Sequence, residues 1–166
     1  NTALGLVDFK EIGVHWTHNN GIVDQKYIDN YVDKYITYTE VNGKKMAAYV
    51  VGEGKDTLVF MRGNDDPCPT MSMRRTADKL AEKYRVIVLD YLGTGFSDKS
   101  ETERTSKNIA YEIHEALHNL GIDGKYILVP EYISGLYAQE YVKRRTKSCN
   151  TWRTKIAINL LTILFD

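Results

Sequence analysis

A short helical motif places two histidines where they could share a metal ion. Residues 114–118, HEALH, match H-E-x-x-H, in which histidines four residues apart on a helix can bind zinc while the glutamate acts as a base. The same predicted helix needs an apolar face to pack on a sheet, which leaves both histidines on its flank. A zinc protease also needs a third protein ligand, and no histidine follows His118. We therefore expect helix-flank histidines, with no metal and no other cofactor.

Five charged or hydroxyl-bearing residues follow two predicted buried strands, TLVFM and YILV. They are Arg62, Asp65, Asp66, Glu131 and Tyr132. Doubly wound sheets bind ligands beyond the carboxyl ends of their strands, so these side chains should line a charged mouth there. Two interpretations stay open for this mouth. It binds a small polar or anionic ligand through Arg62 and nearby backbone N–H groups, or its charges are solvated loop residues.

The segments that would position these residues alternate between strand and helix. Short apolar runs predict buried strands, and amphipathic stretches between them predict helices. The predicted strands are 57–61, 85–90, 126–129 and 156–161, and the predicted helices are 69–84, 106–120 and 136–147. Such an alternation with short links predicts an α/β fold with a doubly wound, mostly parallel sheet.

The chain before this alternation differs from it. Residues 35–41 and 45–51 are strand-like and flank Asn42-Gly43, the strongest short hairpin signal, so they predict an antiparallel hairpin. Residues 1–33 are polar and aromatic without a sustained period, which predicts an irregular arm with one helical turn near 25–32. We therefore divide the chain into this arm and one partial domain, residues 34–166.

Three segments resemble the opening of the α/β-hydrolase fold. LVFMRGN, residues 58–64, resembles the family's apolar strand followed by His-Gly-X. VIVLDYLGTGFSD, residues 86–98, resembles its strand and Gly-x-Gly-x-Ser loop, and YILVPEYISGL, residues 126–136, resembles its strand, nucleophile elbow and helix. The resemblance implies an N-terminal part of this fold, truncated after the sixth strand, with ester or acyl hydrolysis by descent. The alternative is another doubly wound fold.

The resemblance also assigns positions to a catalytic site. Tyr132 stands at the nucleophile position, Asn64 and Ile133 stand at the oxyanion-hole N–H positions, and Arg62 replaces the family's histidine. A phenol has an ordinary pKa of about 10, and its oxygen lies too far from the backbone to meet the oxyanion donors. Ser134 is the nearest suitable hydroxyl. It is either a displaced nucleophile or, as we expect, the small residue that the strained turn requires.

The general base is a second departure from the family. Its triad runs nucleophile, acid, histidine along the chain, whereas all four histidines here precede Tyr132. Asp166 could serve as the acid but would have no histidine to orient. We therefore expect an esterase-like pseudoenzyme that is inactive in this chain. The alternative is a non-catalytic ligand-binding or interaction module that uses the charged mouth.

Composition argues against several classes of partner. Lys+Arg and Asp+Glu number 22 each, so the formal net charge is zero and no long-range field would attract nucleic acid or an anionic membrane. The first residues lack the basic start and apolar stretch of a signal peptide, and no apolar run reaches the length of a membrane span. Cys68 and Cys149 fit neither a disulfide framework nor a CxxC metal site. We expect a soluble chain and assign it no compartment.

The last predicted strand bears on association. Residues 156–165, IAINLLTILF, carry no charge, proline or glycine. An edge strand without such residues pairs readily with another chain. We therefore expect a homodimer, or a partner chain that pairs with this strand, unless the segment folds back on the sheet or forms a helix.

Overall fold

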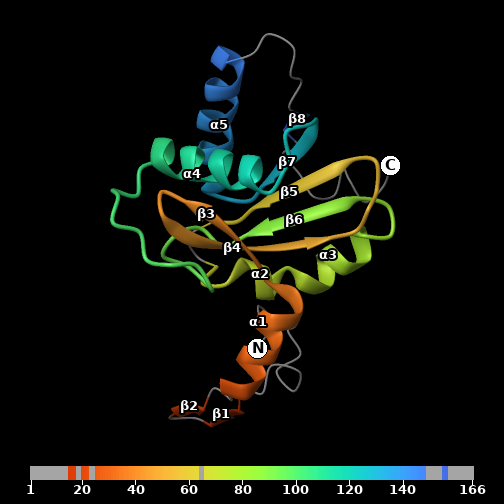
Figure 1. The fold of residues 1–166 in the computed structure, drawn as a ribbon, viewed down its shortest axis with the longest axis vertical. Helices are drawn as coiled ribbons and strands as arrows, with labels where there is room; N and C mark the ends of the chain where they lie inside the picture. The colour runs from red at the N-terminus through yellow and green to blue at the C-terminus, as the bar shows by residue number, and fades with distance from the viewer. Residues whose placement is uncertain (1–14, 18–19, 23–24, 64–65, 149–154, 157–166) are drawn as a thin grey trace.

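The computed structural model describes residues 15–17, 20–22, 25–63, 66–148 and 155–156, and its centre is a mixed sheet (Figure 1). The described residues form six strands in the order β3-β4-β6-β5-β7-β8. These strands are β3 (Thr37–Val41), β4 (Lys44–Val51), β5 (Thr57–Met61), β6 (Arg85–Leu89), β7 (Tyr126–Pro130) and β8 (Lys155–Ile156). β4 is antiparallel to both β3 and β6, whereas β6, β5, β7 and β8 run parallel. The predicted α/β class is therefore confirmed.

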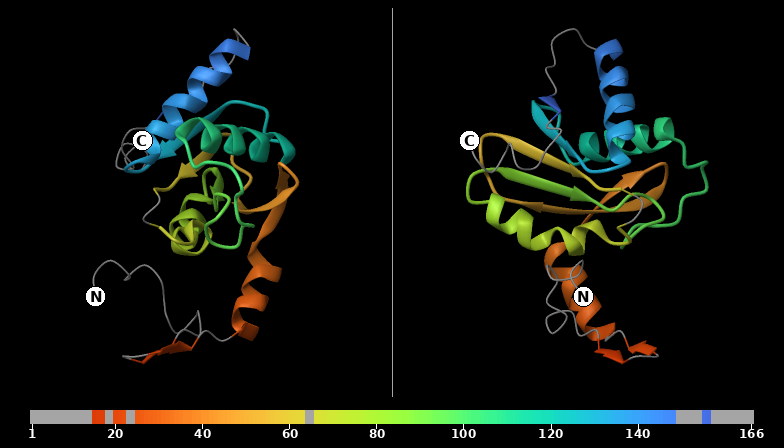
Figure 2. Two further views of the ribbon diagram at one scale, coloured as in Figure 1. Left: turned by 90° about the vertical axis from the view of Figure 1, so that its left-hand side faces the viewer. Right: turned by 180° about the vertical axis from the view of Figure 1, so that it is seen from behind.

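Helices cover both faces of this sheet (Figures 1 and 2). One face carries α2 (Pro69–Ser72) and α3 (Arg74–Leu80), and the other carries α4 (Ser106–Asn119) and α5 (Ser134–Ser148). Successive side chains of a strand point to opposite faces, so each parallel strand supplies both cores. Val59 and Met61 pack in the cluster that includes α4 and α5, while Leu58 and Phe60 pack in the cluster that includes α3. The parallel strands β5 and β6 are consequently apolar from their second residue on.

The hairpin has the turn that its sequence predicts. Asn42 and Gly43 both have positive φ, 54° and 70°, and Val41 pairs with Lys44 across them. Positive φ at both central residues is the requirement of a type I′ turn, whose twist matches the flanking strands. The first strand nevertheless begins at Thr37, because the preceding residues belong to a helix.

The prediction of an irregular arm was wrong for the described part of residues 1–33. β1 (His15–Thr17) pairs antiparallel with β2 (Asn20–Ile22), and α1 (Gln25–Tyr35) is an eleven-residue helix where one turn was expected. Packing explains α1: Tyr31 is buried, its hydroxyl donates to the Thr70 carbonyl oxygen at 3.0 Å, and its ring stacks on Phe96 with centroids 5.9 Å apart. The helical spacing of the tyrosines in this segment is the sequence signal that predicts a longer helix.

Other boundaries differ from prediction by a few residues. The predicted helix 69–84 is divided at Met73 into α2 and α3 and ends at Leu80, and α5 begins two residues early, at Ser134. Of the last predicted strand, only its beginning, in β8, is described. The segment 157–165, on which the predicted pairing depends, lies outside the described residues.

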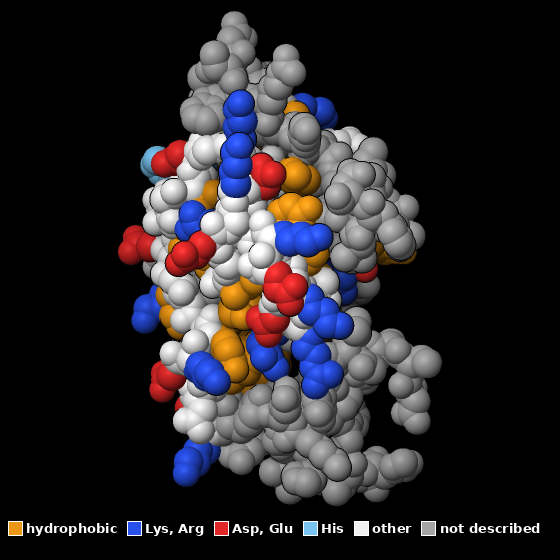
Figure 3. All heavy atoms as spheres, turned by 90° about the vertical axis from the view of Figure 1, so that its right-hand side faces the viewer, with side chains coloured by type: hydrophobic (Ala, Val, Ile, Leu, Met, Phe, Trp, Pro, Cys, Tyr) orange, Lys and Arg blue, Asp and Glu red, His pale blue; other side chains and the backbone are white. Residues whose placement is uncertain are grey.

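Charges of both signs are intermixed on the side of the molecule shown in Figure 3. Lys and Arg side chains lie among Asp and Glu side chains there, with hydrophobic side chains between them. This face therefore presents no continuous surface of one sign, which agrees with the formal net charge of zero. Within the described part of the chain, no helix combines the length and apolarity needed to cross a membrane.

Candidate functional site

The turn between β7 and α5 has a strained backbone at its tip. Tyr132 has a φ of 55°, and Asn42 is the only other non-glycine residue with positive φ in the described part of the chain. A bulky residue in this conformation costs about 1 to 3 kcal/mol and persists only where its surroundings fix it. The Tyr132 side chain itself is 86% exposed. The structure thus keeps a tight strand-to-helix turn and presents a phenol at its tip.

Ser134 fixes this turn from beneath. Its side chain is fully buried, and its hydroxyl oxygen accepts a hydrogen bond from the Glu131 N–H at 2.7 Å. The same hydroxyl can donate its hydrogen to the carbonyl oxygen of Met61, at 2.5 Å, or of Glu131, at 2.7 Å. Of the two roles considered from the sequence, the structure places Ser134 in that of the small residue packed under the turn.

Arg62 joins the ends of the neighbouring strands β5 and β7. Its Nε donates to Asp66 Oδ2 at 2.9 Å, and its Nη1 forms an ion pair with the Glu131 carboxylate. Asp66 is buried and also accepts hydrogen bonds from Ser72 Oγ at 2.5 Å and from the Cys68 N–H at 3.1 Å. Two carboxylates therefore compensate the charge of Arg62, which leaves this cluster with little attraction for an anion.

The structure describes part of the predicted oxyanion position. Ile133 is 40% exposed, and no described residue accepts a hydrogen bond from its backbone N–H. That N–H, at the start of α5, is free to bind a ligand oxygen. Asn64, the second predicted donor, and Asp65, the third carboxylate predicted for the mouth, lie outside the described residues.

A buried carboxylate organises the loop after β6. Asp90 accepts hydrogen bonds from the Thr70 N–H and hydroxyl, both at 2.8 Å, and from the Phe96 N–H at 3.0 Å. Burial raises the pKa of Asp90, while these hydrogen bonds oppose that rise. Gly95 passes so close that a Cβ atom there would lie 2.1 Å from Asp90 Oδ2. The second glycine of the Gly-x-Gly-x-Ser loop is thus required by packing against the carboxylate.

The same loop is attached to β4 by two further side chains. Ser97 Oγ donates to the Asp90 carbonyl oxygen at 2.6 Å and accepts from the Ala47 N–H at 2.8 Å. Asp98 Oδ2 accepts from the Lys45 N–H at 2.7 Å. Sequence reasoning used this segment for the resemblance but gave its side chains no role. The signal available was a carboxylate, Asp90, directly after a buried apolar run.

The two histidines of the HEALH motif have separate surroundings. His118 is exposed, and its Nδ1 lies 2.7 Å from Asp123 Oδ1, a contact that raises the pKa of His118 above its ordinary value. The His114 ring packs edge-on against Tyr141, with centroids 5.9 Å apart. Among the described residues, no group of three or more His, Cys, Asp or Glu side chains is arranged to hold a metal ion.

Cys68 lies beside the buried carboxylate of Asp90, with Sγ 3.9 Å from Oδ2. Burial, with the nearby charge of Asp90 as a second cause, raises the pKa of the Cys68 thiol to about 12. The thiol is therefore protonated at neutral pH, and a protonated thiol is a weak nucleophile.

No family model matches the chain, but curated proteins do. The uncharacterized protein YbdG of Bacillus subtilis (strain 168) is 34% identical over 111 residues, which cover 67% of this chain and 34% of that protein. The 2-hydroxy-6-oxo-6-(2'-aminophenyl)hexa-2,4-dienoic acid hydrolase of Metapseudomonas resinovorans is 25% identical over 113 residues, which cover 68% of this chain and 38% of that protein. The chain therefore spans little more than a third of the length of these relatives.

Solved structures show the same architecture. Est816, described as an N-acyl homoserine lactone degrading enzyme, superposes with a TM-score of 0.60 at 22% identity, covering 72% of this chain and 42% of its own. Epoxide hydrolase VrEH1 from Vigna radiata gives a TM-score of 0.59 at 24% identity, covering 70% and 38%. A thermophilic esterase from Thermogutta terrifontis gives 0.56 at 23% identity, covering 67% and 40%. Over roughly 70% of its length, the chain is a relative of the α/β-hydrolase fold proteins and corresponds to a part of their domain.

Proposed function

We propose that this chain keeps part of the α/β-hydrolase framework but does not catalyse ester or acyl hydrolysis. The observation that carries the proposal is the contrast between two hydroxyl groups at the turn after β7. Tyr132 occupies the tip and is 86% exposed, whereas Ser134 is fully buried with its hydroxyl engaged by backbone groups. A nucleophile has to be both close to the oxyanion donors and open to substrate. Neither residue combines the two properties.

The positions of the two histidines of α4 support the same proposal. A hydroxyl nucleophile needs a base within hydrogen-bond reach to take its proton. The two histidines of α4 are engaged elsewhere, His118 with Asp123 and His114 against Tyr141. At the turn itself, the carboxylate of Glu131 forms an ion pair with Arg62.

An activity-based probe tests this proposal directly. A fluorophosphonate reacts covalently with an activated hydroxyl, and mass spectrometry locates the adduct. We expect no adduct on Tyr132 or Ser134 after an incubation that labels a serine esterase completely. A stoichiometric adduct on either residue, abolished by Tyr132→Phe or Ser134→Ala respectively, would overturn the proposal.

A binding function is the second candidate, and one observation favours it. Tyr132, Ile133 and Leu136 are 86%, 40% and 50% exposed, and they are three of the four exposed large hydrophobic residues in the described part of the chain. They lie together on the turn and the first turn of α5, beside the Arg62–Glu131 ion pair. Clustered exposed apolar side chains next to polar groups are typical of binding sites.

In this second candidate function, the charged mouth binds a small polar ligand that also has an apolar part. The ligand would contact Arg62 and the Ile133 N–H through its polar atoms and Leu136 through its apolar atoms. A thermal-shift screen of small polar compounds should give hits that Arg62→Ala and Leu136→Lys both remove. Identical profiles for the wild type and both variants would leave the mouth without a binding role. We propose no nucleic-acid partner, because the formal net charge is zero.

The segment 156–165 has a proposed role in the association of this chain with another chain. The described part of this segment belongs to β8, which ends the strand order and pairs with β7. We propose that the uncharged segment pairs with a second copy or with a partner chain. Light scattering at micromolar concentration should give a mass above 19.0 kDa that Leu161→Lys reduces. A single 19.0 kDa species that is unchanged by Leu161→Lys would exclude pairing between copies.

A further inference from the structure

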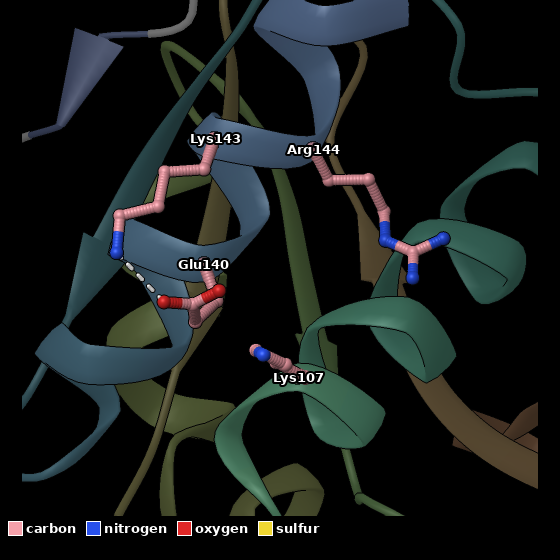
Figure 4. Close-up of a pocket in the computed structure, with 4 residues that line it drawn as sticks. All are labelled: Lys107, Glu140, Lys143 and Arg144. Carbon is pink, nitrogen blue, oxygen red and sulfur yellow. Dashed lines mark hydrogen bonds and ion pairs between the residues drawn. The ribbon is translucent and has the colours of Figure 1, made fainter.

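A hollow of about 350 Å³ lies between α4 and α5 and shares no residue with the charged mouth. Its lining includes Lys107 of α4 and Glu140, Lys143 and Arg144 of α5. In Figure 4, Lys107 extends from α4 toward Glu140, while Arg144 reaches from α5 across to α4. These four lining residues therefore bring together three cations and one carboxylate from two facing helices.

The single carboxylate is already engaged within this lining. Glu140 Oε1 lies 2.7 Å from Lys143 Nζ, so these two charges compensate each other. No described residue forms a hydrogen bond or ion pair with the Lys107 ammonium group. Lys107 therefore contributes a positive charge that forms no ion pair with a described carboxylate.

Arg144 is oriented by an aromatic ring and not by a carboxylate. Its guanidinium carbon lies 4.9 Å from the ring centroid of Tyr111, a residue of α4. A cation–π contact holds the planar group in place while its N–H groups at the edge stay free to donate. Arg144 thus offers a preoriented fork of donors on the same hollow as the Lys107 ammonium.

We propose that this hollow binds a small phosphorylated sugar or polyol. A guanidinium fork and an ammonium group on opposite helices suit the several oxygens of a phosphate, with which Arg forms paired hydrogen bonds. Glu140 can accept hydrogen bonds from hydroxyl groups of the remainder of the molecule. The volume lies at the small end of the range for ligand pockets, roughly 300 to 1,000 Å³, which suits a compact ligand.

Calorimetric titration at low salt tests the site with inorganic phosphate, glucose 6-phosphate and glucose as probes. We expect glucose 6-phosphate to bind more tightly than inorganic phosphate and glucose to show no binding. Lys107→Gln and Arg144→Gln should each weaken glucose 6-phosphate roughly tenfold, the cost of one charge-assisted hydrogen bond. Glu140→Gln should strengthen binding of inorganic phosphate several-fold, because it removes the only negative charge among the described lining residues, an effect that loss of structure would not produce.

Lys125→Gln is the matched control, because Lys125 is an exposed lysine outside the hollow. It should leave both affinities unchanged, and thermal unfolding should show that all four variants are folded. The proposal is overturned if neither phosphate compound binds the wild type at millimolar concentration. It is equally overturned if Lys125→Gln weakens binding as much as Arg144→Gln, or if a polyglutamate peptide binds the hollow in preference to glucose 6-phosphate.

Discussion

Two connections at the carboxyl ends of the parallel strands have changed to different extents from the α/β-hydrolase pattern. The loop after β6 has the Gly-x-Gly-x-Ser residues of the family's pattern, and two of them, Gly95 and Ser97, are fixed by close contacts with Asp90. The turn after β7 has a strained backbone at Tyr132, the residue that the resemblance aligns with the family's nucleophile. We therefore expect different residues to specify the backbone geometry and the chemical reactivity of this turn.

Burial separates the two kinds of residue. The side chains that hold the backbone, Asp90 and Ser134, are fully buried and hydrogen-bonded to main-chain groups. The tip residue Tyr132 is 86% exposed, so its replacement costs the fold little. We therefore expect the backbone of the turn to persist whichever residue occupies its tip. The following predictions test that separation.

The largest effect should come from removing the buried carboxylate. Asp90→Ala leaves the N–H and hydroxyl of Thr70 and the N–H of Phe96 without their acceptor. Each buried orphaned donor costs about 1 to 3 kcal/mol, so the free energy of unfolding should fall by roughly 4 kcal/mol. Urea denaturation measures this change. Asp56→Ala, at an exposed position, should change it by less than about 0.5 kcal/mol, and equal losses in the two variants would contradict a special role for Asp90.

Removing the anchor of the turn should have a smaller effect. Ser134→Ala deletes the hydroxyl that lies between the Glu131 N–H and the Met61 carbonyl oxygen. Glu131 N–H keeps its second hydrogen bond to the Met61 oxygen, at 2.9 Å, so we expect a loss of about 1 to 2 kcal/mol in the free energy of unfolding. Ser106→Ala, at the half-buried first residue of α4, is a control. No loss for Ser134→Ala would show that the turn does not depend on this anchor.

Replacing the tip residue should act in the opposite direction. Glycine adopts a φ of 55° without steric cost, whereas Tyr132 is strained there. Tyr132→Gly should therefore raise the free energy of unfolding by about 1 kcal/mol. Leu136→Gly, within α5, should lower it by about 1 kcal/mol. A similar loss for both variants in urea denaturation would mean that the Tyr132 side chain contributes to the fold.

The smallest effect should come from an ion pair outside both connections. Asp123 raises the pKa of the exposed His118. The stabilisation from this pair is complete below the pKa of an unfolded histidine, about 6.5, and is lost as pH rises through the folded value. An NMR titration should give His118 a midpoint above 6.5 that Asp123→Asn lowers. An unchanged midpoint in Asp123→Asn would contradict the pairing.

The sequence predicted the elements whose periodicity and end signals agree. The helix that begins at Ser106 was located correctly because apolar spacing coincides with the Thr105 cap, whose side chain accepts from the Asn108 N–H at 3.2 Å. The helix α1 was predicted too short, as one turn near 25–32, because its packing residues are tyrosines, which fit strand and arm patterns equally well. Long-range contacts, such as Tyr31 with Thr70, decided its length.

The grouping of side chains was predicted better than their ion pairs. Residues at the ends of predicted strands were expected to line a charged mouth, and the structure places Arg62 and Glu131 together. Asp66 also contacts Arg62, so the charge of Arg62 is compensated by two carboxylates, which the sequence did not predict. Local loop geometry determines which charges meet, and a sequence pattern does not specify that geometry.

Hydrolysis of p-nitrophenyl acetate tests most directly whether the turn after β7 keeps its backbone conformation without esterase activity. We predict that the wild type releases p-nitrophenol no faster than a heat-treated control. We also predict that Tyr132→Ser stays at the same rate, because a serine without a positioned histidine remains protonated and weakly nucleophilic. Turnover by the wild type that Tyr132→Phe or Ser134→Ala abolishes would contradict the loss of the nucleophile, and turnover gained by Tyr132→Ser would contradict the absence of a base.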